Sequence, residues 1–300
     1  MKKLIYILCF IAFNGFGQHL PLQSHYMFNG IALNPALTGS EDVLSIVGSF
    51  RFQWTGITGA PQTQNLTVHG PLKKDKNAVG LQVFNDQIGV DRNTGVFGLY
   101  SYRIKQKNSS LLFGIKAGVN FRKISYSKLI VNDLEDQEVQ YDTPSKILPS
   151  FSFGMHYFTE KYFISFAIPN LIRHNYVSNT FKVNSNYNLT LGGGVVFKLK
   201  KQIKLKPSLL IKYNTDSRIQ FDLNLITKLN KAISIGASYR TQEAVIFMIK
   251  VNPSQQLGVM YSFGIPVNKL MKQTFGSHEM SLKYTFIYKT KISNPRVLEW

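Results

Sequence analysis

The sequence predicts an all-β fold, an outer-membrane antiparallel β-barrel of about 14 strands over residues 43–288. Three observations predict it: an apolar leader typical of exported proteins, polar–apolar alternation that recurs along the chain, and connections of which nearly every second one is long. Side chains alternate between the faces of a strand, so each such segment has one apolar and one polar face. Because a soluble β-sandwich shows the same alternation, the leader and the connection lengths decide between the two folds.

Residues 1–17 are predicted to be a secretory signal peptide. Two lysines form a basic start, residues 4–16 are largely apolar, and Gly17 offers a small residue at the cleavage point. The apolar stretch is too short for a membrane-spanning helix. The only cysteine, Cys9, lies inside this stretch. The mature chain therefore has no cysteine for disulfides or thiolate metal sites.

Residues 18–42 are predicted to be an N-terminal segment that lies in the periplasm or inside the barrel lumen. The pair Asn34-Pro35 favours a turn within it. A barrel of about 14 strands encloses a lumen wide enough to leak unless it is filled, which favours a plug. An even number of strands places both termini on the short-turn, periplasmic side.

The barrel strands are recognised by their alternation, which residues 218–226 show most clearly. Apolar residues occupy one face of this segment, whereas Arg218, Gln220 and Asp222 lie on the other. Residues beyond the last strand, 289–300, are predicted to form a tail. The predicted strands are 43–53, 62–70, 77–86, 94–104, 111–123, 149–158, 161–168, 187–200, 203–213, 218–228, 231–240, 244–251, 256–264 and 278–288.

The connections between these strands differ in length in an ordered way. Outer-membrane barrels have short turns at the periplasmic end and longer loops at the other, and nothing enforces this order in a soluble sandwich. Two odd-numbered connections, 214–217 and 241–243, are short and depart from it. The long ones are 54–61, 87–93, 124–148, 169–186 and 265–277, all odd-numbered.

The formal net charge is +19, with 35 Lys or Arg against 16 Asp or Glu. Many basic residues fall at predicted connections, such as 73–76, 105–107 and 198–201, and do not form one patch. Nucleic-acid-binding proteins gather such residues on one face, so the sequence predicts no nucleic-acid partner. A basic rim instead suits the anionic head groups of outer-membrane lipid or an acidic partner.

Several sequence blocks carry a family resemblance. Near the start are Asn-Pro-Ala-Leu-Thr-Gly at 34–39, Arg-Phe-Gln-Trp at 51–54 and Gly-Ala-Pro-Gln-Thr at 59–63. With these blocks the chain resembles the PorP/SprF family of the type IX secretion system in Bacteroidota, from about residue 20 to residue 288. Weaker matches follow in order at 78–81, 85–89, 207–209 and 276–279.

The resemblance implies a non-enzymatic outer-membrane barrel that works in protein secretion and, in some members, in gliding motility. The implied partners are a secreted, adhesin-like cargo, which is docked through its C-terminal sorting domain, and other type IX secretion components. Among those components is a periplasmic protein that anchors the machinery to peptidoglycan. The blocks do not indicate which cargo or which branch of the family applies to this chain.

Candidate partner-binding residues come first from the block at 51–63, which is expected to lie at the first long loop. Arg51, Trp54 and Pro61 are the candidates. An arginine near a tryptophan can form a cation–π or capping contact, and proline and glycine fix a tight path. The alternative is that this segment is a structural loop that shapes the mouth of the barrel.

The longest predicted loop supplies three further candidates, Asp133, Glu135 and Asp136. Clustered carboxylates attract hard cations, but their spacing does not fit an EF-hand loop. We therefore expect a solvated acidic surface that suits a basic or hydrophobic partner, and no metal site.

No motif indicates catalysis or a cofactor. The glycines at 192–194 lack the Lys-Ser/Thr that follows a phosphate-binding loop, and the six histidines lack metal-binding spacing. A catalytic triad is a spatial arrangement, so this observation is weak evidence. The alternative function is a passive, porin-like solute channel. Inward side chains such as Lys116 and Arg122, or the N-terminal segment, would narrow it.

Overall fold

The computed structural model describes residues 23–72, 76–128, 145–172, 175–177, 182–184, 188–200, 202–214 and 219–287. The predicted signal peptide and the predicted tail lie outside these residues. Among the residues described, no helix is long and apolar enough to cross a membrane. The regular structure consists of strands and short 3₁₀ helices.

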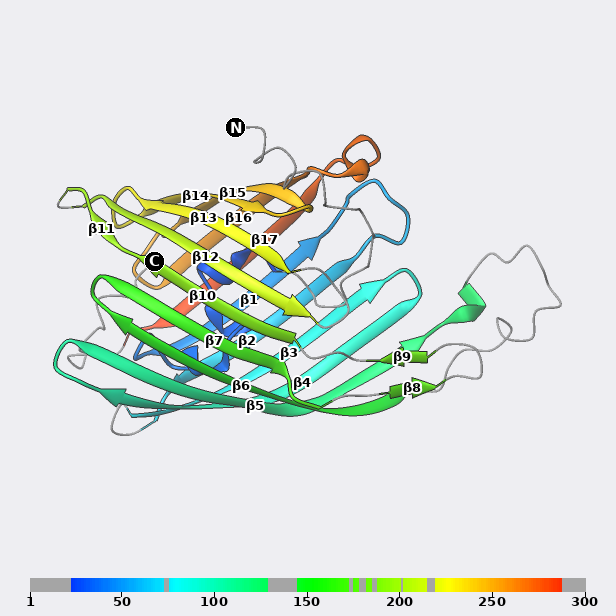
Figure 1. Cartoon of the computed structure of the whole chain (residues 1–300), viewed down its shortest axis with the longest axis horizontal. Coiled ribbons are helices and arrows are strands. Elements are labelled where there is room, and N and C mark those ends of the chain that lie inside the picture. Colours follow the sequence, from blue (N-terminus) through cyan, green and yellow to red (C-terminus); the bar gives the residue numbers. More distant parts are fainter. Residues whose placement is uncertain are drawn as a thin grey trace, which may run out of the picture.

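One antiparallel sheet closes on itself to form the barrel (Figure 1). Strands that are consecutive in the chain pair from β1 to β7 and from β11 to β17, β1 pairs with β17, and β10 pairs with both β7 and β12. The two-residue strand β11 continues β10, so the closed barrel has 14 strands, and the predicted fold is confirmed. Closure leaves no unpaired edge, which a sheet in lipid requires.

The strand boundaries follow the alternation closely. A separate hairpin of β8 (Asn175–Val177) and β9 (Lys182–Asn184) lies in the connection between β7 and β10. The barrel strands are β1 (Leu44–Phe52), β2 (Gln62–Pro71), β3 (Asn77–Ile88), β4 (Asp91–Lys105), β5 (Ser109–Ile124), β6 (Lys146–Thr159), β7 (Tyr162–Asn170), β10 (Asn188–Val195), β11 (Phe197–Lys198), β12 (Lys204–Asn214), β13 (Gln220–Lys228), β14 (Ile233–Arg240), β15 (Ala244–Val251), β16 (Leu257–Pro266) and β17 (Ser277–Phe286).

The outer face of the barrel is apolar and the lumen is mostly polar. In β13, the outward Phe221 and Leu223 are 40% and 54% exposed, whereas the inward Asp222 and Asn224 are buried. In β17, Met280 likewise faces outward. An apolar exterior of this kind dissolves in the hydrocarbon of a bilayer.

One predicted long loop is wrong. Residues 87–93 were expected to connect two strands, but β3 runs to Ile88 and β4 begins at Asp91. Their ladder continues to the pair Ile88↔Asp91, and Gly89 takes a positive φ of 57° in the two-residue turn. The polar composition of this stretch suggests a loop, yet its backbone hydrogen bonds are those of a hairpin.

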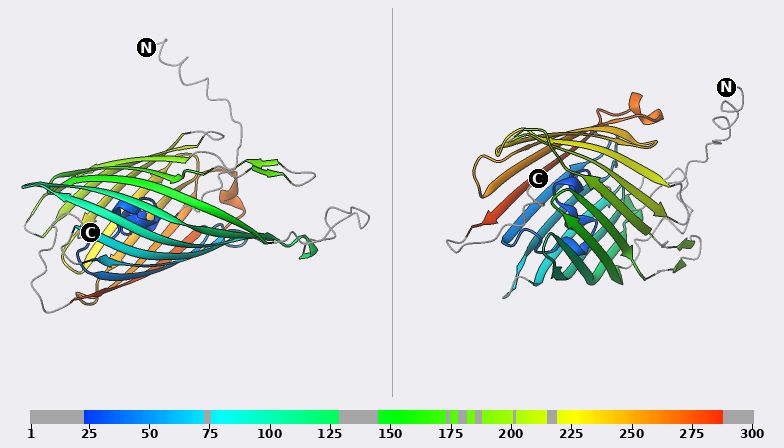
Figure 2. Two further views of the ribbon diagram at one scale, coloured as in Figure 1. Left: turned by 90° about the horizontal axis from the view of Figure 1, so that it is seen from below. Right: turned by 60° about the vertical axis from the view of Figure 1, so that its left-hand side comes forward.

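The N-terminal segment, here residues 23–43, lies inside the barrel (Figure 2). It forms three single-turn 3₁₀ helices, η1 (His25–Met27), η2 (Gly30–Ala32) and η3 (Pro35–Leu37). The third packs against β4, β5 and β6 on the inner wall. Most residues of this segment are buried or half-buried, which inside a barrel means that they contact the wall or each other.

An apolar cluster inside the lumen holds this segment against the wall. Phe28 packs against inward-facing residues of β13, β15 and β16, among them Ile226, Ile246 and Met260, which are at most 2% exposed. In a water-filled channel these wall residues would face water. Removing a side chain of this size from water contributes roughly 1.5–3 kcal/mol, so the segment and the wall stabilise each other.

We predict that Phe28→Ala destabilises the barrel. Phe28 fills space between the segment and three strands, and such a truncation typically costs about 3–5 kcal/mol. The measurement is the unfolding midpoint of the purified protein in detergent. Phe275→Ala is the matched control, because Phe275 is 81% exposed and should change the midpoint little. Equal effects of the two substitutions would show that the segment is not packed as described.

Candidate functional site

A buried carboxylate in the barrel wall fixes the start of the N-terminal segment. Glu279 of β17 accepts hydrogen bonds from the backbone N–H groups of Ser24, at 2.6 Å, and His25, at 3.1 Å. The Arg51 guanidinium donates to the same carboxylate at 3.3 Å and to the Ser24 hydroxyl at 2.8 Å. All four residues are at most 5% exposed. The segment therefore completes the hydrogen bonds of a charge that the wall has buried.

The His25 side chain adds a further contact beside Glu279, Arg51 and Ser24. Its Nδ1 lies 2.6 Å from the Ser281 hydroxyl. Burial lowers the pKa of His25, and the nearby Glu279 carboxylate offsets this effect only partly. The ring holds the segment by its hydrogen bond to Ser281, and its Nδ1 lies 3.5 Å from the Glu279 carboxylate.

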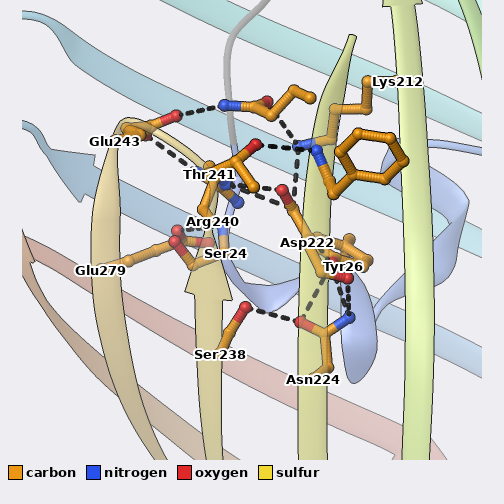
Figure 3. A network of polar contacts seen from close by, with 12 residues as sticks. Ser24, Tyr26, Lys212, Asp222, Asn224, Ser238, Arg240, Thr241, Glu243 and Glu279 are labelled. Carbon is orange, nitrogen blue, oxygen red and sulfur yellow. Dashed lines mark hydrogen bonds and ion pairs between the residues drawn. The ribbon is translucent and has the colours of Figure 1, made fainter. Parts of the chain in front are cut away.

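A second group of charges lies beside the first, on β12, β13 and β14 (Figure 3). Asp222 receives Arg240 Nε at 3.1 Å, Lys212 Nζ at 3.0 Å and the Tyr26 hydroxyl at 3.1 Å. Arg240 also donates to Glu243 at 3.0 Å. Arg240 and Asp222 are fully buried. Removing one partner of a buried pair typically costs about 3–5 kcal/mol, so this network resists opening.

The far end of the segment is held in the same way. The Arg103 guanidinium donates to the Asp42 carboxylate at 2.5 Å and to the Gly39 carbonyl at 3.2 Å. The Ser101 hydroxyl donates to the Thr38 carbonyl at 2.6 Å. Both β4 side chains are under 5% exposed. The segment is thus tied to the wall by buried polar contacts at both ends.

The Asn-Pro block of the resemblance lies in the middle of the segment. The Asn34 side chain accepts from Ala36 N at 2.9 Å and donates to Ser165 Oγ at 2.8 Å and Met155 O at 3.0 Å. Gly154 of β6 permits this approach, because a Cβ there would lie 1.9 Å from Asn34 Oδ1. The block is therefore the part of the plug that fits against β6 and β7.

These contacts give the segment a direction through the lumen. Glu279 and Arg51 lie at the end of the barrel where the long loops are, next to the connection between β16 and β17. Asp42 lies at the other end, two residues before β1 begins at Leu44. The barrel strands begin and end on the short-turn side as expected, but Ser24 lies at the long-loop end. The chain therefore runs through the lumen before β1 begins.

Of the candidate partner-binding residues, Arg51 is inside the lumen and two others are in the first loop. Arg51 is engaged with Ser24 and Glu279. Trp54 adopts a positive φ of 52°, and its backbone N–H donates to Ser277 Oγ at 3.1 Å. The Pro61 carbonyl accepts from Gln53 N at 2.9 Å and closes the base of the loop. Partner binding by these residues stays a prediction.

The acidic candidates Asp133, Glu135 and Asp136 lie outside the described residues, and their proposed role stays a prediction. Within the described part of the chain, no group of three His, Cys, Asp or Glu side chains is placed to hold a metal ion.

Three connections at the long-loop end form one hydrogen-bonded unit, which we call the rim sector: residues 53–61, 89–90 and 267–276. Thr55 N donates to the Gly276 carbonyl and Phe275 N to the Thr55 carbonyl, both at 2.8 Å. Gly89 N donates to the Gly59 carbonyl at 2.8 Å. The rim sector is ordered by its own backbone contacts, and it exposes Phe275, at 81%, and Met271, at 59%.

Sequence reasoning did not identify Glu279, Arg240 and Tyr26 as site residues. The sequence did contain an indication for Glu279 and Arg240, because a charged side chain at an inward strand position must find a partner in the lumen. The place where Phe28 packs was indicated by the run Ala244–Ile249, in which consecutive residues are apolar. A strand whose two faces are both buried has such a continuous apolar sequence.

We predict that ionised Glu41 stabilises the plug in a pH-dependent way. Its carboxylate bonds the Lys283 ammonium and accepts from the Ser45 hydroxyl at 2.7 Å. Burial raises the pKa of Glu41, but Lys283, His69 and the Ser45 hydroxyl together outweigh burial, and the pKa falls from 4.5 to about 2. The stabilisation is therefore complete above pH about 4.5 and disappears as the pH falls towards 2.

Glu41→Gln should accordingly lower the free energy of unfolding in detergent at pH 7 by at most about 3 kcal/mol. Its difference from the unsubstituted protein should shrink between pH 4.5 and pH 2. Glu160→Gln is the control, since the Glu160–Lys198 pair is exposed. A difference that is the same at both pH values would contradict the assignment.

A labelling experiment tests the direction of the plug. We expect Gln23→Cys, or an epitope tag inserted directly before Gln23, to react from the same side of the membrane as Gln273→Cys in the rim sector. Asn108→Cys, in a short turn, should react only from the opposite side. Reaction of the Gln23 variants together with Asn108→Cys would overturn the threading direction.

Comparison with known proteins supports the fold and assigns the family. No curated protein matches the chain. Among solved structures, the CymD monoaromatic hydrocarbon channel gives a TM-score of 0.52 at 11% identity, covering 92% of this chain and 96% of that one. The Acinetobacter baumannii outer membrane protein Omp33 gives 0.47 at 9% identity, covering 83% and 100%. The CymD likeness concerns the fold alone.

The family assignment comes from the sequence itself. A family model described as "Type IX secretion system membrane protein PorP/SprF" matches residues 15–284. The match covers the segment in the lumen and nearly the whole barrel, and it confirms the predicted resemblance. The chain is an integral outer-membrane β-barrel that belongs to the PorP/SprF family of type IX secretion membrane proteins.

Proposed function

We propose that this barrel is a non-enzymatic docking component of type IX secretion. It holds a secreted, adhesin-like cargo, through the cargo's C-terminal sorting domain, at the long-loop end. Its short turns face the periplasm and meet other components of the machinery, including a protein anchored to peptidoglycan. The long loops face the outside, as is usual in outer-membrane barrels.

The observation that carries this proposal is the filled lumen. The segment 23–43 is held inside the barrel by the buried Glu279 and Asp222 networks and by the apolar cluster around Phe28. Expelling it would remove the hydrogen bonds that Ser24, His25 and Tyr26 donate to the buried Glu279 and Asp222, and would expose apolar wall residues to water. A barrel built in this way suits a fixed platform in the membrane better than a passage for polypeptide or solute.

The rim sector is the surface that suits a partner best. Its loops are held by hydrogen bonds, so that little order has to be gained on binding. Phe275 and Met271 project from it, and large apolar side chains of this kind are enriched at protein interfaces. Trp54 and Pro61 belong to the same sector, which connects the sequence candidates to this surface.

We predict that Phe275→Asp combined with Met271→Asp abolishes surface display of the cargo while the barrel still reaches the outer membrane. A charge at each position would oppose burial of this surface against a partner. Display is measured by labelling intact cells for surface adhesins, and barrel level by membrane fractionation. Gln273→Asp is the control, because it adds a charge to the same loop at an exposed polar position.

Two results would count against the proposal. Normal display of every type IX cargo in a strain that lacks the barrel would remove the docking role. Stable, large conductance of the purified barrel in planar bilayers would favour the alternative of a passive solute channel.

A further inference from the structure

The short-turn end of the barrel carries exposed lysines on four turns that follow one another around the sheet. These turns join β4 to β5, β6 to β7, β11 to β12 and β13 to β14, at the left-hand end of the barrel in Figure 1. The strands that carry them are neighbours, because β10, which β11 continues, pairs with both β7 and β12. We call the four exposed residues the lysine arc: Lys107, Lys161, Lys200 and Lys231.

The protein itself does not compensate the charge of the lysine arc. Among the described residues of these four turns, Glu160 is the only acid, and it pairs with Lys198 at 3.3 Å. No lysine of the arc forms an ion pair within the described part of the chain. The turn between β15 and β16, residues 252–256, contains no charged residue. The positive charge therefore extends from β4 to β14 and is absent from the turn between β15 and β16.

Exposed apolar side chains border the lysine arc. Tyr162 begins β7 directly after one lysine, and Leu199 and Leu229 directly follow β11 and β13, just before two others. Their exposed fractions are 42%, 60% and 38%. They extend the apolar outer face, which dissolves in hydrocarbon, to the edge of the turns. The arc therefore lies where the hydrocarbon ends, and a lysine there can lay its aliphatic stem along the apolar border and place its ammonium among lipid head groups.

Backbone hydrogen bonds hold the turns of the arc in place. The Lys161 carbonyl accepts from Val196 N at 2.6 Å. The Lys231 carbonyl accepts from Asn252 Nδ2 at 3.2 Å. Because these backbone positions are fixed before binding, only the lysine side chains have to be ordered by a ligand.

We propose that the lysine arc binds the head groups of anionic phospholipids in the leaflet at the short-turn end. The ammonium groups donate to the phosphate oxygens, and the bordering apolar side chains contact the acyl chains. An acidic protein is the other class of partner for such a charge. The apolar border favours lipid, because it places the ammonium groups at the depth of the head groups. The barrel thus gathers anionic lipid on the sector from β4 to β14 and not at the turn between β15 and β16.

The test uses the full-length barrel in phosphatidylcholine bilayers, with fluorescent phosphatidylglycerol or phosphatidylcholine as the probe. A donor dye is placed on Asn108→Cys, beside the arc, or on Gln255→Cys, in the uncharged turn. A Cys9→Ser background leaves the introduced cysteine as the only one. Energy transfer should show phosphatidylglycerol enriched over phosphatidylcholine by about fivefold at Asn108→Cys, as one lysine near an anionic head group provides. At Gln255→Cys the two lipids should transfer equally.

Charge-removing and charge-retaining variants separate the arc from other sources of enrichment. Replacing all four lysines of the arc by glutamine should abolish the enrichment at Asn108→Cys, whereas replacing all four by arginine should retain it. Raising the salt concentration from about 0.1 M to about 1 M should also weaken it in the unsubstituted arc, because the screening length falls from about 10 Å to about 3 Å. This salt experiment needs no variant of the arc to fold.

Three results would overturn the proposal. The first is equal transfer from the two lipids at Asn108→Cys, which would leave the arc as a surface for an acidic protein. The second is an equal enrichment at Gln255→Cys, which would make it a property of the whole barrel. The third is an enrichment that persists after all four lysines are replaced by glutamine.

Discussion

A barrel in lipid must pair every backbone N–H and C=O group within the protein, because the hydrocarbon offers no partner. Closure of the sheet through the β10–β12 and β1–β17 ladders satisfies this requirement. Closure also creates a lumen. The inward side chains of the lumen wall determine where the N-terminal segment packs. The wall of the lumen contains both charged and apolar side chains. In a water-filled channel the apolar side chains would face water.

The N-terminal segment satisfies both kinds of wall residue at once. Its backbone N–H groups complete the coordination of Glu279, its Tyr26 hydroxyl reaches Asp222, and Phe28 covers the apolar wall. Each contact is buried, so removing the segment costs the hydrogen bonds that it donates to buried carboxylates and exposes apolar surface. This mutual dependence keeps the segment in the lumen and leaves the rim sector, at the long-loop end, as the candidate surface for recognition.

The alternation in the sequence was enough to predict the strands and their outward faces, and the leader and the connection lengths added the closed barrel. It failed where polar residues continue a hairpin, as between β3 and β4, because backbone pairing up to Ile88↔Asp91 does not depend on alternating side chains. It also predicted Asp222 inside the lumen, where the structure has it. It did not indicate which groups would meet it, since Lys212, Arg240 and Tyr26 come from three separate parts of the chain.

The sequence by itself determined the membrane class, the number of strands and the family, because periodicity and short motifs are local properties of the chain. Only the tertiary structure decided that Arg51 faces Ser24 and Glu279, that Asn34 fits against Gly154, and that the chain passes through the lumen before its first strand. These facts depend on which residues pair between neighbouring strands, as Arg51 pairs with Glu279 between β1 and β17, and on where the N-terminal segment meets the wall. Closure and stagger of the sheet set those neighbours, and no periodicity in one strand records them.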